Sequence, residues 1–578
     1  MDKMYSNDKN VQILITVLKA YNIRKVVASP GTTNFPFVYS IQQDDFFDVY
    51  SCVDERSAAY MACGLSLESG EAIVITCTGA TASRNYLPAL TEAFYRKLPI
   101  IVVAGTDGNH NIGHLSPQIM DRSISPKDAV RFSVSISNIN SQIDEWGNNL
   151  KINSAISEAF RHGGGPVLIT LQYSEAPFEC SVIPSYRVIK RVTYDDLSWP
   201  DLENKRIAVF IGAHKKFKDD EIAIIDRFCE VNNAYVFCDH TSAYNGKYRI
   251  NYSLAASQIY YDPIALQPDI LIHIGEISGE YYMLRKMRPQ SVWRVNEDGE
   301  MRDKFRRLTY VFEMTEKTFF SHYILSSHKN ISNYNALCKE CVELEDKITE
   351  IPFSNIWIAK KIHALMPKNS TIHFGILNSL RSWNFFEIDS SITTSCNVGG
   401  FGIDGAVSTL IGASLCNSDK LFFVILGDLA FFYDLNSICN RHVSKNVRIM
   451  IINNGHGTEF SNYDHPASRL GLKVDDYVAA GGHNGCQSPD LLKSYSENLG
   501  FKYISASNKD EFEQVYEQFI SKKQADKPIL FEIFTEPDSE SEALRILHQT
   551  EVSNTKVLKT KVRSTMHSIK HTIKKFYK

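Results

Sequence analysis

Residues 421–460, LFFVILGDLAFFYDLNSICNRHVSKNVRIMIINNGHGTEF, contain the pattern that decides the fold. It predicts an apolar strand at 421–426, a helix at 434–442 and a second apolar strand at 447–452. Strand, helix and strand in this order form a βαβ unit of a parallel sheet. Asp428 follows the first strand and Asn454 follows the second. Because such sheets bind ligands at the carboxyl ends of their strands, both side chains are expected at a binding edge.

These two side chains suit a hard cation. Carboxylate and amide oxygens are ligands that Mg²⁺ prefers, and bound Mg²⁺ commonly carries the phosphates of a substrate or cofactor. The pattern therefore predicts a site for Mg²⁺ and phosphate at Asp428 and Asn454. An ordinary buried βαβ unit with a turn Asp and a turn Asn would have the same spacing, so the stretch alone leaves both interpretations open.

Length and composition set the class of protein. A chain of 578 residues is too long for one hydrophobic core and predicts about three domains. The net charge of −4 gives no general bias toward nucleic acid. The first residues lack the apolar run of a signal peptide, and Asp428 interrupts the most apolar segment. Twelve cysteines follow no disulfide framework, so a cytoplasmic protein is expected.

A second strand–turn–helix–strand unit lies near the start of the chain, at residues 73–106. It has nearly the length of the unit at 423–458, and both have Gly-rich turns after the first strand. A helix at 11–20 and strands at 25–28 and 47–52 precede it. We therefore interpret residues 1–180 and residues 350–540 as two copies of one α/β design.

The segment between the two copies, residues 190–345, forms a third α/β unit. Four short apolar stretches, RIAVFIG, AYVFC, DILIHIG and SVWRVN, have the spacing of a small parallel sheet, and a polar helical linker at 330–350 ends the unit. The expected fold class is therefore α/β, with three doubly wound parallel-sheet domains. Residues 550–578 form a separate basic tail.

The dipeptide Gly-Asp at 427–428, followed about 26 residues later by Asn-Asn at 453–454, resembles the diphosphate-binding signature of thiamine-diphosphate (ThDP) enzymes. Two α/β domains around a spacer also resemble that family. The resemblance implies ThDP and Mg²⁺ as cofactors, and at least a homodimer, or a homotetramer, because the family's site lies between subunits. Leu429 replaces the usual third residue, Gly. The implied metal ligands are Asp428, Asn454 and the backbone carbonyl of His456.

Five segments show a closer resemblance, to the SEPHCHC synthases of menaquinone biosynthesis, which are 2-oxoglutarate decarboxylases and carboligases. The resemblance covers both cofactor domains well and the spacer only loosely. The segments are SPGTTNFPF (29–37), VDERSAAYMACGL (53–65), TCTGATASRNYLPALTEAFYRKLPIIV (76–102), NVGGFGIDGAVST (397–409) and GDLAFFYDLN (427–436).

The resemblance assigns roles at matching positions. Glu55 would hydrogen-bond the pyrimidine ring of ThDP, and Gln118 would face the reacting centre; a surface Glu paired with Arg56 is the alternative for Glu55. Ile403 would be the apolar side chain that bends the cofactor. The full cofactor-binding set is Ser29, Gly31, Thr32, Thr78, Gly402, Ile403, Gly427, Asp428, Leu429, Asn454 and Phe460.

Departures from the family pattern concern the substrate. The menaquinone enzymes hold substrate carboxylates with arginines, whose planar fork suits a carboxylate. At those places this chain has Thr33, Asp107 and Val398, while Tyr281-Tyr282 replaces a basic pair and Trp383 another Arg. Losing one such contact weakens binding by about 1.5–3 kcal/mol. We expect a paralogue with another substrate, and possible replacement residues are Arg84, Arg381, His110, His114 and His456.

The expected activity is ThDP- and Mg²⁺-dependent decarboxylation of a 2-oxo acid, with transfer of the acyl unit to an acceptor. 2-Oxoglutarate and isochorismate are not the expected substrates. The alternatives are a 2-oxo acid decarboxylase that does not ligate, and a scaffold that retains ThDP without catalysis. The tail at 554–578 has eight Lys/Arg and an apolar helical face. It could contact an anionic membrane surface or a partner, or pack on its own dimer.

Overall fold

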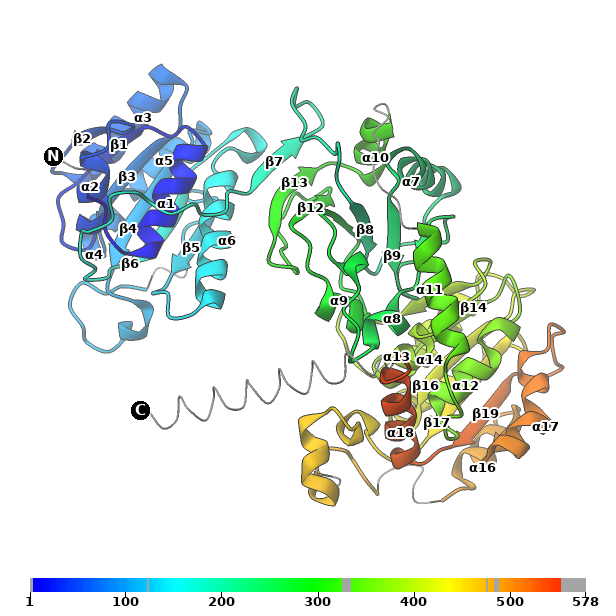
Figure 1. Cartoon of the computed structure of the whole chain (residues 1–578). Helices are drawn as coiled ribbons and strands as arrows, with labels where there is room; N and C mark the ends of the chain where they lie inside the picture. Colours follow the sequence, from blue (N-terminus) through cyan, green and yellow to red (C-terminus); the bar gives the residue numbers. More distant parts are fainter. Residues whose placement is uncertain (1–3, 122–123, 325–333, 475–476, 483–487, 552–578) are drawn as a thin grey trace, which may run out of the picture. The chain divides into compact units, whose positions relative to one another are not determined.

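The computed structural model describes residues 4–121, 124–324, 334–474, 477–482 and 488–551. These residues form three parallel β-sheets flanked by helices (Figure 1). The α/β class expected from the sequence is therefore confirmed. The chain divides into two compact units, which we describe separately: Met1–Thr193 with Asp298–Glu313, and Tyr194–Glu297 with Met314–Lys578.

The first sheet has six parallel strands in the order β2-β1-β3-β4-β6-β5. Its strands are β1 (Lys25–Ala28), β2 (Asp48–Ser51), β3 (Ile73–Thr78), β4 (Ile100–Thr106), β5 (Phe132–Ile136) and β6 (Val167–Gln172). The accompanying helices are α1 (Lys9–Ala20), α2 (Phe35–Gln42), α3 (Glu55–Ser69), α4 (Ala80–Asn85), α5 (Leu87–Tyr95) and α6 (Gln142–Glu158), with 3-10 turns at η1 (Asn109–Asn111) and η2 (Arg161–Gly163).

Both faces of this sheet are covered by helices. Successive strand residues point to opposite faces, so Val26 packs in the core with α1 and α6, whereas Val27 packs with α3 and α5. Burial on both faces explains why the central strands are almost continuously apolar. The turn after β1 packs directly on β4, because a Cβ at Gly105 would lie 2.3 Å from the carbonyl oxygen of Thr33.

The third sheet, which belongs to the second compact unit, has the order β15-β14-β16-β17-β19-β18. This repeats the order of the first sheet, as expected for two copies of one design. Its strands are β14 (Thr371–Phe374), β15 (Thr393–Cys396), β16 (Phe422–Gly427), β17 (Val447–Asn453), β18 (Lys502–Ala506) and β19 (Ile529–Phe534). Its helices are α12 (Asn355–Ile362), α13 (Asn378–Asn384), α14 (Ala406–Ser414), α15 (Asp428–Tyr433), α16 (Leu491–Asn498), α17 (Lys509–Ile520) and α18 (Pro537–His548), with 3-10 turns η4 (His363–Leu365), η5 (Leu435–Cys439), η6 (Thr458–Ser461) and η7 (Pro466–Val474).

One predicted element of the decisive stretch is wrong. The helix expected at 434–442 is instead α15, which begins at Asp428, followed by the 3-10 turn η5. Asp434 lies between them, and its carboxylate accepts hydrogen bonds of 2.6 Å from both the backbone N–H and the hydroxyl of Ser408 on α14. The contact lies directly after the end of α15 at Tyr433 and holds this part of the chain against α14.

The second sheet has seven strands in the order β10-β9-β8-β11-β12-β13-β7. They are β7 (Lys190–Thr193), β8 (Ile207–Ile211), β9 (Tyr235–Cys238), β10 (Arg249–Ile250), β11 (Ile270–Ile274), β12 (Ser291–Asn296) and β13 (Leu308–Glu313), so the four predicted strands are found as β8, β9, β11 and β12. The helices are α7 (Asp219–Asn232), α8 (Ser253–Ser257), α9 (Tyr282–Lys286), α10 (Glu316–Ile324) and α11 (Tyr334–Asp346), with the 3-10 turn η3 (Ile264–Leu266). Helix α11 occupies the predicted polar linker.

The predicted basic tail lies outside the described residues. Within the described part of the chain, no helix has both the length and the apolar content needed to cross a membrane.

Candidate active site

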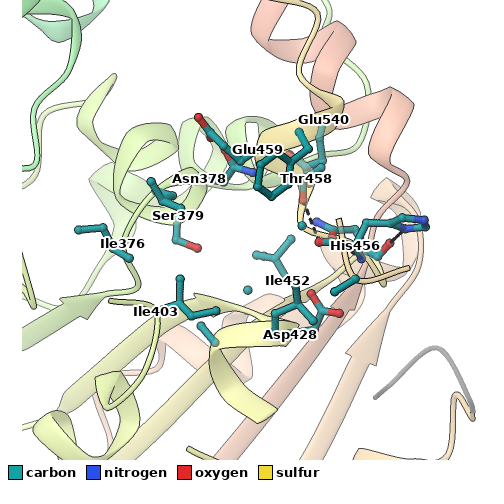
Figure 2. Close-up of a pocket in the computed structure, with 18 of the residues that line it drawn as sticks. Ile376, Asn378, Ser379, Ile403, Asp428, Ile452, His456, Thr458, Glu459 and Glu540 are labelled. Carbon is teal, nitrogen blue, oxygen red and sulfur yellow. Dashed lines mark hydrogen bonds between the residues drawn. The ribbon is translucent and has the colours of Figure 1, made fainter. Parts of the chain in front are cut away.

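A cavity of about 520 Å³ lies at the carboxyl edge of the third sheet, within the second compact unit (Figure 2). Residues that follow three neighbouring strands line it: Ile376 after β14, Asp428 after β16, and Asn454 after β17. Ile403, which precedes α14, forms another part of the wall. The cavity therefore lies where a parallel α/β sheet binds its ligands.

Asp428 is the most buried of the acids that line the cavity. Its side chain is at the first position of α15, and the residue is only 2% exposed. Burial raises the pKa of Asp428 to about 6, although hydrogen bonds from the backbone N–H groups of Leu429 and Gly455 oppose the rise. Its Oδ2 atom is buried without a hydrogen-bond partner among the described residues. A buried carboxylate oxygen of this kind needs a positive or donating ligand.

The loop after β17 is folded tightly opposite Asp428. Gly455 has a φ of +69°, a conformation that favours glycine. Asn454 Oδ1 accepts the backbone N–H of His456 at 3.3 Å, and the His456 ring nitrogen Nδ1 lies 3.0 Å from the Asn454 carbonyl oxygen. The hydroxyl of Thr458 donates to the His456 carbonyl at 3.5 Å. The loop thus presents amide and carbonyl oxygens to the cavity that contains the Asp428 carboxylate.

This donor set fits a hard divalent cation. The oxygens come from one carboxylate, one side-chain amide and one backbone carbonyl, which are the ligand types of Mg²⁺ sites. The described residues contain no cluster of three or more His, Cys, Asp or Glu side chains that could hold a metal.

The structure gathers most of the predicted cofactor-binding residues of this unit at the cavity. Gly402, another predicted cofactor-binding residue, directly precedes Ile403 in the chain but does not line the cavity. The predicted residues that line it are Ile403, Gly427, Asp428, Leu429, Asn454, His456 and Phe460.

Sequence reasoning did not assign the other residues of the cavity wall, and four of them are relevant to its chemistry or backbone strain. Leu377 lies directly before α13 with φ +66° and ψ −119°, which is a strained backbone for a non-glycine residue. Asn378, Glu459 and Glu540 also line the wall. Glu459 directly precedes Phe460, which the sequence assigns to the cofactor site, so its place in the chain could have indicated that it lines the cavity. Glu540 comes from α18, far along the chain, and no local pattern marks it.

Glu540 offers a test of the wall's electrostatics. It is 8% exposed, and its carboxylate accepts the backbone N–H of Asn355 at 2.9 Å and the hydroxyl of Thr535 at 2.8 Å. Burial raises its pKa from 4.5 to about 7, against these hydrogen bonds. Folding therefore favours the neutral form of the Glu540 carboxyl. The stability that this group contributes is fully present below about pH 4.5 and is lost as the pH rises through about 7.

We expect Glu540→Gln to remove this pH dependence. Between about pH 4.5 and pH 7.5, the free energy of unfolding of the wild type should fall by about 3 kcal/mol relative to the variant, since one pKa unit corresponds to about 1.4 kcal/mol. Urea unfolding across this range measures the difference. Glu536→Gln, at an exposed position on the same helix boundary, is the control. Parallel pH curves for wild type and Glu540→Gln would contradict the prediction.

The predicted residues of the first compact unit lie around the carboxyl ends of β1 and β3. Ser29 and Gly31 line a second cavity, of about 750 Å³. Thr32 and Thr78 do not line it, but a Cβ at Gly31 would lie 2.7 Å from the Thr78 Cβ. The hydroxyl of Thr78 lies 2.5 Å from that of Thr33. Gly31 is therefore needed for the turn to pack on β3.

Glu55 is the first residue of α3 in this unit. The carboxylate of Asp54 caps the helix by accepting the Ser57 N–H at 2.8 Å, which explains why the helix begins at Glu55. Glu55 is half-buried, and its Oε2 accepts a hydrogen bond of 3.1 Å from Asn85 on α4. Gln118 is exposed on a loop with a φ of +63°. Both predicted catalytic residues therefore belong to the first unit, whereas Asp428 belongs to the second.

The candidate replacement cations have local roles. Arg84 donates to the carbonyl of Asp121 at 3.0 Å, and His110 and His114 are exposed near η1. Arg381 forms an ion pair with Glu459, with Nη1 and Oε2 2.8 Å apart. His456 alone among these lines the 520 Å³ cavity.

Comparison with known proteins identifies the family of the chain. Residues 9–124 match the family model described as "Thiamine pyrophosphate enzyme, N-terminal TPP binding domain". Over 560 residues the chain is 30% identical to the 2-succinyl-5-enolpyruvyl-6-hydroxy-3-cyclohexene-1-carboxylate synthase of Phocaeicola vulgatus, covering 94% of this chain and 98% of that protein.

Two further relatives with the same name match over similar lengths. The protein of Bacteroides thetaiotaomicron is 29% identical over 570 residues, which cover 94% of this chain and 98% of the relative. The protein of Porphyromonas gingivalis is 25% identical over 571 residues, covering 93% and 96%. The chain therefore belongs to the thiamine-diphosphate-dependent enzyme family that includes the 2-succinyl-5-enolpyruvyl-6-hydroxy-3-cyclohexene-1-carboxylate synthases.

Proposed function

We propose that the protein decarboxylates a 2-oxo acid and transfers the remaining acyl unit to an acceptor, with ThDP and Mg²⁺ as cofactors. The observation that carries the proposal is the buried Asp428, whose Oδ2 has no hydrogen-bond partner among the described residues, in a cavity that Asn454 and His456 also line. In a thiamine enzyme, this is the arrangement expected of the residues that anchor a metal and a diphosphate.

Each predicted residue then has a task. Asp428, Asn454 and the His456 carbonyl would hold Mg²⁺, and Gly427 and Leu429 would bind the diphosphate through their backbone. Ile403, which also lines the cavity, would support the cofactor. Bound ThDP supplies the electron sink that allows a 2-oxo acid to lose CO₂ and its acyl unit to be transferred. The apolar residues Ile376 and Ile452 in the lining help to exclude water.

The first copy of the design, residues 1–180, is assigned to the pyrimidine ring. Glu55 would share a proton with the ring, and Gln118 would contact the reacting substrate. Ser29, Gly31, Thr32 and Thr78 form the turns around the ring. As in the family, we expect two copies of the chain to share each site, so that the working form is at least a homodimer.

The donor is proposed to differ from the diacid used by the menaquinone enzymes. Val398 and Trp383, which stand in place of arginines, are buried apolar side chains, and Tyr282 is engaged by His548 at 2.9 Å. Arg381 is already paired with Glu459. These positions supply no free guanidinium for a substrate carboxylate, which supports a donor and an acceptor of another kind.

A screen of 2-oxo acids tests the proposal. The purified chain with ThDP and Mg²⁺ should release CO₂ from at least one 2-oxo acid, and adding an aldehyde or enoate acceptor should yield a ligated product. Omitting Mg²⁺ in the presence of a chelator should abolish both. Release of CO₂ with a free aldehyde as the only product would identify a non-ligating decarboxylase. Binding of ThDP without turnover of any donor would identify the scaffold alternative.

A further inference from the structure

Glu459, which lines the 520 Å³ cavity (Figure 2), forms an ion pair with Arg381, which lies behind it and is not itself a lining residue. Arg381 on α13 and Glu459 on η6 meet in a two-pronged contact: Nη2 donates to Oε1 at 3.0 Å, and Nη1 lies 2.8 Å from Oε2. This is the fork geometry with which a guanidinium binds any carboxylate. Here the carboxylate comes from the chain itself.

Arg381 is enclosed by its neighbours. Its side chain is 14% exposed, Nη1 also donates to Asn378 Oδ1 at 3.2 Å, and its guanidinium carbon lies 5.7 Å from the ring centroid of Tyr281. Burial alone would lower the pKa of Arg381, but Tyr282, Glu459 and Asp464 raise it above its usual value. The guanidinium is therefore charged, and the two nitrogens that could bind a ligand carboxylate already contact the carboxylate of Glu459.

Glu459 is the partner that faces the cavity. Its side chain is 27% exposed and belongs to the lining, while Asn462 Nδ2 approaches its Oε2 at 3.5 Å. The other acids of the lining are Asp428 and Glu540, and the described lining residues include no Lys or Arg. A second carboxylate of a ligand at this part of the wall would therefore meet the Glu459 carboxylate, because the Arg381 fork is already occupied.

We propose that Glu459 is a specificity-determining residue: by occupying the fork of Arg381, its carboxylate excludes 2-oxo acids that carry a second carboxylate. The inference rests on the proposed function for the reaction and deepens it by naming the donor class, a 2-oxo monocarboxylic acid with a neutral side chain. Arg381 is the cation that a diacid would use if Glu459 did not hold it.

A pair of donors with the same number of carbons tests this directly. Wild-type holoenzyme should have a higher kcat/KM for 2-oxovalerate than for 2-oxoglutarate. Glu459→Gln frees one prong of the Arg381 fork, so the preference should shift toward 2-oxoglutarate by about tenfold or more, the factor expected for one added contact to a charged group. The double variant Arg381→Met/Glu459→Gln should lose this gain. Glu517→Gln, exposed on α17, should leave the preference unchanged.

A binding measurement separates this inference from the proposed reaction. Calorimetric titration with glutarate, an unreactive diacid, should show binding to Glu459→Gln and none, or at least tenfold weaker binding, to wild type and to the double variant. This arm gives an answer even if no 2-oxo acid is turned over. Equal glutarate affinity in wild type and Glu459→Gln, or a wild-type preference for 2-oxoglutarate, would overturn the inference.

Folding of the variants is controlled in two ways. Removing one partner of a buried ion pair is destabilising, so the thermal melt of each variant is recorded first. Glu459→Asp keeps the charge and should keep the exclusion of glutarate. The donor preference of the wild type is measured without any variant. A higher kcat/KM for 2-oxoglutarate than for 2-oxovalerate would by itself contradict the inference.

Discussion

Replacing Glu55 with Gln should lower turnover by about 10²–10⁴-fold, the range typical of losing a general acid–base group. The amide has the size of the carboxyl and can still accept the hydrogen bond that Asn85 donates to Oε2 at 3.1 Å. It cannot share a proton with a ring nitrogen of the cofactor, so the loss should fall on kcat. The affinity for ThDP should stay within about threefold, because the proposed function assigns Mg²⁺ and the diphosphate to Asp428 and Asn454 rather than to Glu55.

Two measurements check this prediction. Calorimetry gives ThDP affinity, and exchange of the cofactor C2 proton, followed by NMR, reports the function of the carboxyl without any substrate. Exchange should be slow in Glu55→Gln and normal in Glu68→Gln, an exposed position on the same helix. A Glu55→Gln protein with wild-type exchange and turnover would refute the role and would support the simpler assignment of Glu55 as a surface residue.

The parts of the site that sequence predicts well are those set by local strand ends. Asp428 and Asn454 each come directly after an apolar strand, and parallel strands bring their carboxyl ends to one edge. The similar length and turns of the units at 73–106 and 423–458 indicated two copies of one design, and the first and third sheets have the same strand order. The two strand ends need no knowledge of distant contacts, so the cavity edge could be placed before its shape was known.

Contacts between distant segments decide what sequence could not predict. The helix expected at 434–442 failed because Asp434 binds Ser408, which is 26 residues away in the chain. Glu459 looks like an ordinary loop acid until the fold brings Arg381, 78 positions earlier, into contact with it. Glu540 reaches the cavity only because α18 returns to the start of α12, where Glu540 binds the Asn355 N–H. The charge character of the cavity wall therefore depends on tertiary packing.

Replacing Asp428 with Ala should abolish the binding of Mg²⁺ and ThDP together. A ligand at about 100 times its dissociation constant stabilises a protein by about 2.7 kcal/mol. The wild type should gain this stability when both cofactors are added, and the variant should gain none. Thermal melts with and without cofactors, together with calorimetry, measure both effects. Asp419→Ala, at an exposed position in the same unit, should respond like the wild type.

The stability of the cofactor-free variant separates a metal ligand from a structural acid. Burial raises the pKa of Asp428 to about 6, so above this pH the folded protein carries a charge that burial disfavours. Removing a carboxylate whose Oδ2 has no partner among the described residues should therefore leave the cofactor-free protein at least as stable near pH 7.5. If Asp428 served only to stabilise the fold, Asp428→Ala would instead lower the free energy of unfolding of the cofactor-free protein. If Asp428→Ala unfolds more easily without cofactors yet binds ThDP normally, the anchoring role is excluded.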